Sequence, residues 1–315
     1  MKPGLIKSTY IAWVKNDKQI IFMFLLVCLY MYVISPLIIC SEYMAQPLCF
    51  VEPYMSFVGN GFCMPLIVMI FLVTIIDFPD ISGNITFVLH RSGRMKWYNN
   101  QLVFLVLSII SFIIILLVFS IVFTGRLSFI TNGWSNTMIN LNNESIEEYR
   151  NLKSTYPLAV TDLSMINHFR PYNAAVYNTI LMILMLMFHG QLQMCLSVCF
   201  NKGVGCITSL SVLGLGLLTW AASSKLKWIF PLANSTVGIC LRETVAIKQV
   251  IIIHSNSYCK FTALCKSDLL AEIYSMISHI FLCTRLRMYY LTCRRIVSCH
   301  SCDDGDRVIH IRIHC

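Results

Sequence analysis

The sequence predicts an all-α fold, in the form of a polytopic bundle of transmembrane helices. Hydrophobic residues make up 57% of its 315 residues and charged residues only 12%, which is about half the charged share of soluble domains. Long uncharged apolar runs also recur throughout the part of the chain that precedes Lys225. Because so few charges cannot cover a water-facing surface, lipid is the expected solvent for most of this chain.

Five apolar runs reach the roughly 20 residues that a helix needs to cross the hydrocarbon core. A sixth span is expected to be missing or degraded, because the uncharged stretches after Ser224 are all shorter. The first run, which follows Lys18, is too long for a cleavable signal and is interpreted as an uncleaved span. The spans are predicted at residues 20–39, 57–76, 102–123, 174–200 and 204–224, within a membrane domain of residues 1–241.

Basic residues indicate which ends of the spans face the cytoplasm. The segment before the first span carries four lysines, and the loop between the second and third spans carries Arg91, Arg94 and Lys96. The loop at residues 125–172 is polar and richer in acidic residues. By the positive-inside rule the N-terminus is cytoplasmic and the 125–172 loop is external, although Lys225 and Lys227 would then lie outside. This arrangement accounts for the net charge of +9, and no nucleic-acid partner is expected.

The segment before the first span has helical periodicity of its own. Ile6, Tyr10 and Trp13 recur at helical spacing, while Lys7 and Lys18 lie on another face. This pattern predicts a short helix lying in the membrane interface, with Trp13 at the level of the lipid headgroups. A disordered basic tail is the alternative interpretation.

No sequence signature of an enzyme is present. The chain contains no GxxxxGK[ST] phosphate-binding loop, no GxSxG and no HExxH, so it is expected to have no catalytic centre and no cofactor. Polar groups at depth are confined to His189, Gln191 and Gln193 in the fourth span. They either hydrogen-bond to neighbouring helices or line a substrate path.

The loop at residues 77–101 combines apolar and basic side chains. Phe87 and Leu89 would be exposed in a cytoplasmic loop beside Arg91 and Arg94, which indicates a docking face for another protein. The alternative gives the arginines and Trp97 an orienting role only, as positive-inside anchors and part of an aromatic belt.

The same loop carries the pattern F-P, then N-x-x-F-x-x-x-R-x-G-R-x-x-W and a following Gln101. The matching residues are Asn84, Phe87, Arg91, Gly93, Arg94 and Trp97. This pattern resembles the membrane subunits of ABC-2 type transporters from Gram-positive bacteria, although Asn100 stands where Gly is usual. Residues 200–205 resemble the short inner turn between spans four and five of such proteins, and the resemblance covers about residues 5 to 240.

The resemblance implies a function and partners. Such subunits are permeases with six helices and an interfacial N-terminal helix, and the loop after their second span contacts a separate ATPase. Two permease subunits pair with two ATPase subunits in the plasma membrane, and ATP drives alternating access. The expected function is therefore that of an exporter permease, with ATP hydrolysis on another chain. The runner-up is a non-transporting membrane sensor or immunity-type protein that binds a ligand at its external loop.

Residues 242–315 fit neither lipid nor a packed core. This tail is rich in Cys, His and Arg, and Cys299, Cys302, His310 and His314 have zinc-like spacing that matches no standard finger. A metal-binding tail and a disordered basic tail are two interpretations. The favoured one is a shifted reading frame past about Thr236 that replaces an apolar last helix.

The frame-shift interpretation predicts a property of the gene. Another frame of the DNA after codon 236 should encode about 20 consecutive apolar residues, which sequencing of the locus would reveal. If neither other frame contains such a run, the tail is genuine, and the zinc content of the purified protein then becomes the measurement of interest.

Overall fold

The computed structural model describes residues 3–79, 94–143, 145–157, 159–222 and 232. The chain divides into two units, Met1–Cys259 and Lys260–Cys315, and all described residues belong to the first. Their structure is helical except for two short strands, β1 (Leu48–Cys49) and β2 (Ser128–Phe129), which pair in parallel. The predicted all-α class is therefore confirmed for this part of the chain.

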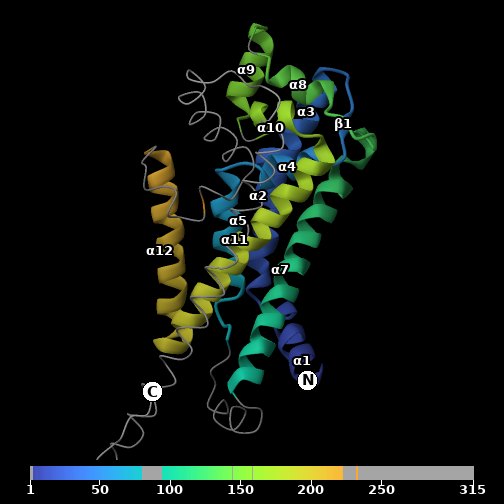
Figure 1. The fold of residues 1–315 in the computed structure, drawn as a ribbon. Coiled ribbons are helices and arrows are strands. Elements are labelled where there is room, and N and C mark those ends of the chain that lie inside the picture. Colours follow the sequence, from blue (N-terminus) through green and yellow to red (C-terminus); the bar gives the residue numbers. More distant parts are fainter. Residues whose placement is uncertain (1–2, 80–93, 144, 158, 223–231, 233–315) are drawn as a thin grey trace, which may run out of the picture. The chain divides into compact units, whose positions relative to one another are not determined.

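Four continuous helical stretches are long and apolar enough to cross a membrane (Figure 1). They coincide with four of the five predicted runs. They are Gln19–Tyr43, Lys96–Leu127, Pro171–Val198 and Lys202–Ala221. The corresponding elements are α2 (Gln19–Leu29), η1 (Tyr30–Ile34) and α3 (Ser35–Tyr43), then α7 (Arg94–Thr124), α11 (Pro171–Cys199) and α12 (Lys202–Ala221).

The first stretch changes its helical pitch before a proline. Residues Tyr30–Ile34 form one π-helical turn, in which the Ser35 N–H bonds to the Tyr30 carbonyl. Pro36 has no N–H for the carbonyl four residues earlier, and its ring would crowd that carbonyl in a regular α-helix. The wider π turn accommodates the proline while the helix continues to Tyr43.

The span predicted at residues 57–76 is not one continuous helix in the structure. This region contains α4 (Glu52–Val58) and α5 (Cys63–Thr74), which are bent by 78° relative to each other. The Asn60 side chain accepts a hydrogen bond of 2.8 Å from the Phe62 N–H, a local contact that competes with helix formation. Gly59 allows close packing here, because a Cβ atom would lie 2.8 Å from the Met55 carbonyl oxygen. The two helices supply a fifth crossing only if the bent pair is counted as one span.

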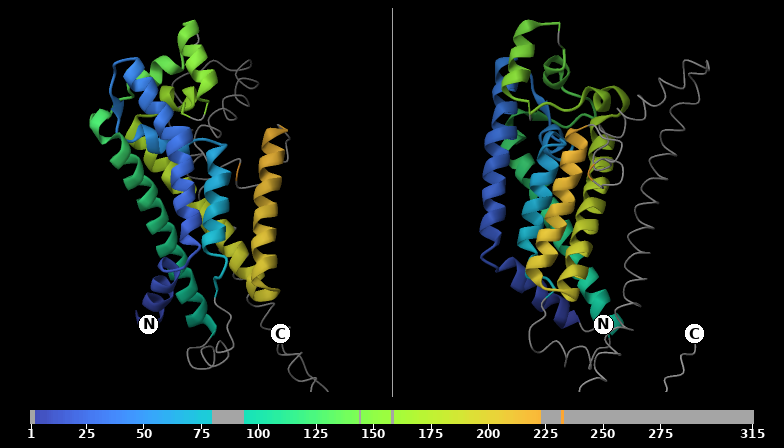
Figure 2. Two further views of the ribbon diagram at one scale, coloured as in Figure 1. Left: turned by 180° about the vertical axis from the view of Figure 1, so that it is seen from behind. Right: turned by 90° about the vertical axis from the view of Figure 1, so that its left-hand side faces the viewer.

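The helix α11 is the common packing partner within the bundle (Figure 2). It contacts α4, α5, α7 and α12, and α2 joins the bundle through α5. Of the four long stretches, α12 buries the smallest share of its residues.

The N-terminal helix α1 (Pro3–Val14) packs against α7. The Tyr10 hydroxyl lies 2.6 Å from the Ser111 hydroxyl, and the buried Trp13 ring meets the Phe104 ring edge-on. Lys7 is exposed on another side of the helix. The apolar face predicted from Tyr10 and Trp13 is therefore used for packing on α7, and the interfacial position of α1 stays a prediction.

The loop at residues 125–172 folds into a small cap. It contains η2 (Gly125–Leu127), α8 (Asn136–Leu141), α9 (Glu147–Thr155) and α10 (Leu163–His168). The Trp134 indole N–H donates to the Phe169 carbonyl at 2.7 Å, and the Ser56 hydroxyl of α4 donates to the Ala159 carbonyl at 3.0 Å. The first contact stabilises the cap itself, and the second fixes the cap to the bundle.

A buried carboxylate joins the cap to α4. Glu52 is fully buried, and its two oxygens accept the N–H groups of Cys49 at 2.9 Å and Ser135 at 2.6 Å. The Ser135 hydroxyl in turn accepts the Met138 N–H and caps α8. One side chain therefore holds β1 and the start of α8 on the first turn of α4.

We expect Glu52→Gln to destabilise the protein. A glutamine side chain has the same shape but only one acceptor oxygen, so its NH₂ group would face one of the two backbone N–H donors. Leaving that buried N–H unpaired should lower the free energy of unfolding by about 1–3 kcal/mol. Thermal unfolding in detergent should show a lower Tm for Glu52→Gln and little change for Glu147→Gln, whose side chain is exposed. Equal Tm values for the two variants would contradict this role of the carboxylate.

Candidate functional site

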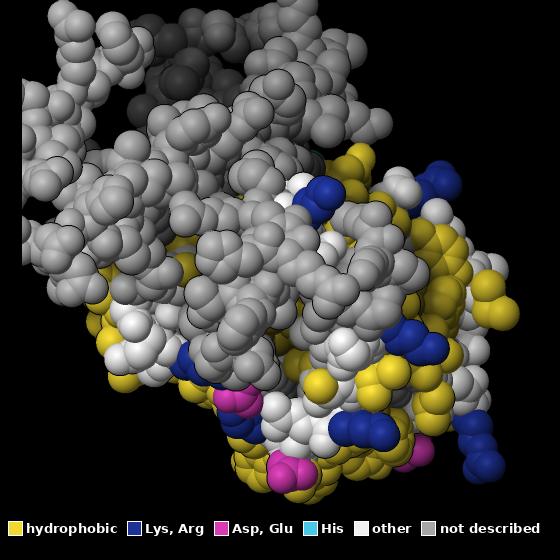
Figure 3. Space-filling model, turned by 90° about the horizontal axis from the view of Figure 1, so that it is seen from below, with side chains coloured by type: hydrophobic (Ala, Val, Ile, Leu, Met, Phe, Trp, Pro, Cys, Tyr) yellow, Lys and Arg dark blue, Asp and Glu magenta, His cyan; other side chains and the backbone are white. Residues whose placement is uncertain are grey.

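The candidate site lies at one end of the bundle. There α1 turns into α2, α5 ends, α7 begins, and α11 turns into α12 (Figure 1). We call it the basic end, because Lys side chains outnumber Asp there among the described residues. Those side chains are Lys7, Lys15, Lys18, Lys96 and Lys202, with Asp17 and Asp77. Figure 3 shows the basic side chains in blue, spread over this face.

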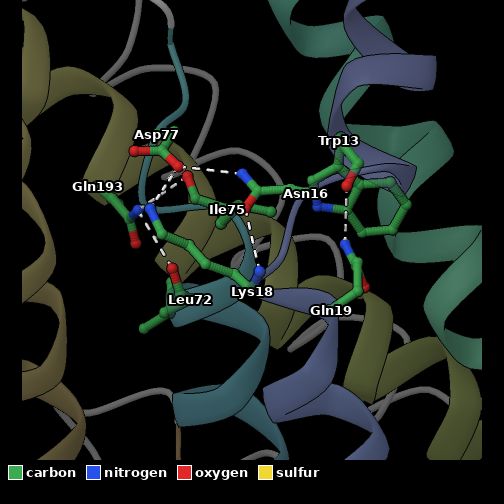
Figure 4. A network of polar contacts seen from close by, with 8 residues as sticks. All are labelled: Trp13, Asn16, Lys18, Gln19, Leu72, Ile75, Asp77 and Gln193. Carbon is green, nitrogen blue, oxygen red and sulfur yellow. Dashed lines mark hydrogen bonds and ion pairs between the residues drawn. The ribbon is translucent and has the colours of Figure 1, made fainter.

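An ion pair joins two segments that are far apart in the sequence (Figure 4). The Lys18 ammonium group binds the Asp77 carboxylate, and the Asn16 amide donates to the same carboxylate oxygen at 3.1 Å. The Asn16 side-chain oxygen also accepts the Lys18 N–H at 3.0 Å. Asp77 lies after α5 and two residues before residue 79, which is the last residue described ahead of the segment 80–93. The base of the segment 80–93 is therefore tied to the turn between α1 and α2.

Electrostatics at this ion pair favour the charged carboxylate. The hydrogen bond from Lys18 holds the pKa of Asp77 below its ordinary value, and Asn16 and Lys202 act in the same direction. Both side chains of the pair remain partly exposed to solvent. Solvent-exposed pairs of this kind contribute about 0–1 kcal/mol, so the pair positions the chain more than it stabilises the fold.

Gln193 connects α11 to the end of α5. Its side-chain NH₂ group donates to the carbonyls of Leu72 at 3.4 Å and Ile75 at 3.2 Å (Figure 4). These carbonyls belong to the last turn of α5 and the residue after it, where intrahelical donors run out. Gln193 therefore caps α5 two residues before Asp77. Gln19 makes a similar contact at the end of α1, donating to the Trp13 carbonyl at 3.1 Å.

The residues predicted to line a substrate path are all buried in α11. His189 and Gln193 are four residues apart and share one helix face, whereas Gln191 lies on another. Both ring nitrogens of His189 lack a hydrogen-bond partner in the described structure. Their burial within the bundle fits either of the two interpretations given for them, and their role as a path stays a prediction.

The predicted coupling loop lies largely outside the described residues. This applies to Phe87, Leu89, Arg91, Gly93 and the side chain of Arg94. Trp97 is buried in the first turns of α7.

The weak metal candidates Cys299, Cys302, His310 and His314 also fall outside the described residues. Where the structure does describe the chain, no group of three or more His, Cys, Asp or Glu side chains could hold a metal ion.

Sequence reasoning missed the ion pair at the basic end. Lys18 precedes the first apolar run and Asp77 follows the second, and no partner was predicted for either of them. A usable signal did exist, because the predicted topology brings the residue before the first span and the residue after the second span to the same side of the membrane. Their opposite charges make a pair there plausible on charge alone.

No protein-family model, curated protein or solved structure matches this chain. The resemblance of residues 77–101 to ABC-2 permeases therefore remains a prediction from the motif.

The Lys18–Asp77 pair predicts a pH-dependent difference between variants. Because the pKa of Asp77 is lowered in the folded protein, its contribution is present above the unfolded pKa of about 3.9 and is lost as the pH falls through the folded value. Asp77→Asn should lower the Tm slightly at pH 7, and the difference from wild type should vanish in strong acid or high salt. Asp17→Asn, an exposed change in the same turn, is the control. A Tm difference for Asp77→Asn that is independent of pH would refute the ion-pair explanation.

Proposed function

We propose that this chain is the membrane-spanning permease subunit of an ATP-driven exporter of the ABC-2 type. It moves substrate by alternating access and is powered by a separate ATPase chain. The observation that carries the proposal is the junction at the basic end. There Lys18 and Gln193 hold the base of the segment 80–93, through Asp77 and the end of α5, against both the N-terminal turn and α11.

This junction supplies a physical route for force. The segment 80–93 connects the end of α5 to the start of α7, so a partner that moves the segment would pull on both helices. Gln193 would pass a shift of α5 to α11, and α11 contacts α4, α7 and α12. A single docking event could thereby reach most of the bundle. Phe87 and Leu89 are the proposed buried anchors of that docking, with Arg91 and Arg94 at the rim.

The proposed topology has five crossings, with the bent pair α4–α5 counted as one. The N-terminus and the segment 80–93 face the cytoplasm of a bacterial cell, and the cap lies outside. The surplus of Lys at the basic end supports this orientation. The helix α1 lies at the inner interface, which suits the exposed Ile11 and Val14 beside Lys7 and Lys15. A second permease subunit and two ATPase chains complete the assembly.

A membrane sensor or immunity-type protein is the second candidate. The cap favours it, since Glu52 accepts a hydrogen bond from the Ser135 N–H and Ser56 donates one to the Ala159 carbonyl. These buried contacts give the loop a defined structure suited to recognising an external ligand. Such a protein would not need the segment 80–93 to bind an ATPase, and this difference allows a test.

The double variant Phe87→Ala with Leu89→Ala should insert normally but lose its ATPase. It removes no charge, so the orienting role of the arginines is preserved. Truncating a buried anchor commonly costs about 2 kcal/mol or more, roughly thirtyfold in Kd. The measurement is co-purification of the ATPase from membranes, together with substrate export by whole cells.

The matched control is Ile130→Ala with Ile139→Ala, which removes exposed apolar side chains from the cap instead. This control should bind the ATPase like wild type. If the Phe87 and Leu89 variant also binds and exports normally, the segment is not the coupling element. If no ATPase accompanies even the wild-type chain, the sensor candidate is favoured.

A further inference from the structure

One face of α11 carries three polar residues in a row. His189, Gln193 and Ser197 follow one another at intervals of four residues, so they lie on one side of the helix. All three are almost completely buried, with exposed fractions of 0%, 0% and 1%. At about 1.5 Å per residue, the row extends over roughly 12 Å.

The helix α12 closes over this row. The Ser209 hydroxyl approaches the His189 carbonyl at 3.5 Å. Gly205 lies so close to Ser197 that a Cβ atom would stand 2.3 Å from the serine hydroxyl oxygen. The polar row is therefore enclosed by the protein and does not face lipid.

Several polar atoms of the row have no partner among the described residues. They are both ring nitrogens of His189, the side-chain oxygen of Gln193 and the hydroxyl of Ser197. The orientation of the Gln193 amide is defined by its contacts, because the opposite orientation would set its oxygen against the carbonyls of Leu72 and Ile75. A buried polar atom without a partner destabilises the fold, and the large majority of buried side-chain polar atoms have a partner. Four such atoms in one row require a partner that the described residues do not supply.

The chemistry of the surroundings selects an uncharged partner. The helices α5 and α11 contain no Lys, Arg, Asp or Glu, and α12 contains only Lys202 at its first position. A charged ligand beside His189 would therefore find no counter-ion deep in these three helices, and an unpaired buried charge is strongly destabilising. Gln193 offers an acceptor, whereas the hydroxyl and the imidazole can both donate and accept. Water both donates and accepts hydrogen bonds, so it has the chemistry to satisfy each of these atoms.

One end of the row lies close to the exposed turn between α11 and α12. Ser197 lies one turn from the α11–α12 turn at the basic end, and Gln193 binds the carbonyl of Ile75, two residues from Asp77. In the other direction the same face continues with Met185 and Met182, which are fully buried and apolar. Polar contacts are thus available from the basic end as far as His189 and no farther.

We propose that His189, Gln193 and Ser197 bind a line of internal water that reaches from the basic end to the middle of α11. Met185 and Met182 close the line on the side of the cap. The line gives hydrated access from one side of the membrane to His189. It goes beyond the proposed transport function and does not depend on an ATPase partner.

Thiol labelling tests the water line in sealed membrane vesicles of both orientations. Single substitutions Ser197→Cys, Gln193→Cys and His189→Cys are compared with Met182→Cys and Leu186→Cys, which place a thiol in apolar surroundings on the same helix. The probe is a small, membrane-impermeant methanethiosulfonate, and mass spectrometry locates the label, so the native cysteines can stay. Lys15→Cys and Ser145→Cys, both exposed, report which side the reagent reaches.

The thiols at positions 193 and 197 should react at least about tenfold faster than those at 182 and 186, because a thiol in dry apolar surroundings rarely ionises. Reaction should occur only when the reagent reaches Lys15→Cys, and position 189 should be the last to react. Equal, slow labelling at all five positions would show that the row is dry and would overturn the proposal. Labelling from the side of Ser145→Cys would overturn the closure by Met182 and Met185.

A second measurement uses the wild-type protein, so misfolding of a variant cannot affect its result. Amide hydrogen exchange of residues 189–198 should be faster than that of residues 179–188 in the same helix, since only the first stretch lies beside water. Equal protection of the two stretches would also overturn the proposal.

Discussion

The packing of α11 is the constraint on which the rest of this bundle depends. It contacts α4, α5, α7 and α12 directly, and α2 reaches it through α5. The neighbours must accommodate polar side chains on a helix that carries no Asp, Glu, Lys or Arg. Gly205 of α12 does so by leaving room for Ser197, and the end of α5 does so by offering free carbonyls to Gln193. A bundle of purely apolar surfaces would have no comparable means of fixing which helix faces which.

The membrane-length helices could be predicted from composition because hydrocarbon imposes a minimum length on any crossing segment. The predicted run 174–200 lies almost wholly within the observed α11, Pro171–Cys199. The bend between α4 and α5 could not be predicted in the same way, since residues 57–76 are apolar whether the helix is straight or broken. At the bend, the Asn60 side chain accepts a hydrogen bond from the Phe62 N–H, and Met165 and Asn178 pack around Gly59. Met165 and Asn178 are distant from Gly59 in the sequence, so their contact with it could not be predicted.

The polar junction was only partly visible in the sequence for a related reason. Gln193 stood out as a polar group at depth, but its partners are backbone carbonyls of Leu72 and Ile75, which no sequence motif marks. Lys18 and Asp77 are 59 residues apart, and each is explained locally as a charge beside an apolar run. Pairing of such residues is a property of the tertiary structure, so composition and spacing can suggest it but do not specify it.

The bend between α4 and α5 also determines where the loop at residues 125–172 can be shortened or extended. The helix α5 has 12 residues, about 18 Å, against a hydrocarbon thickness of about 30 Å. Because α4 is bent by 78° relative to α5, it adds little to the membrane thickness that this crossing covers. All seven residues of α4 are buried. The outer part of this crossing is therefore built jointly by α4 and the loop residues that bind it, such as Ser135 and Ala159. Shortening the loop would remove the Ser135 N–H, one of the two backbone donors to the carboxylate of Glu52. Insertions and tags should be tolerated in α9, none of whose residues is buried.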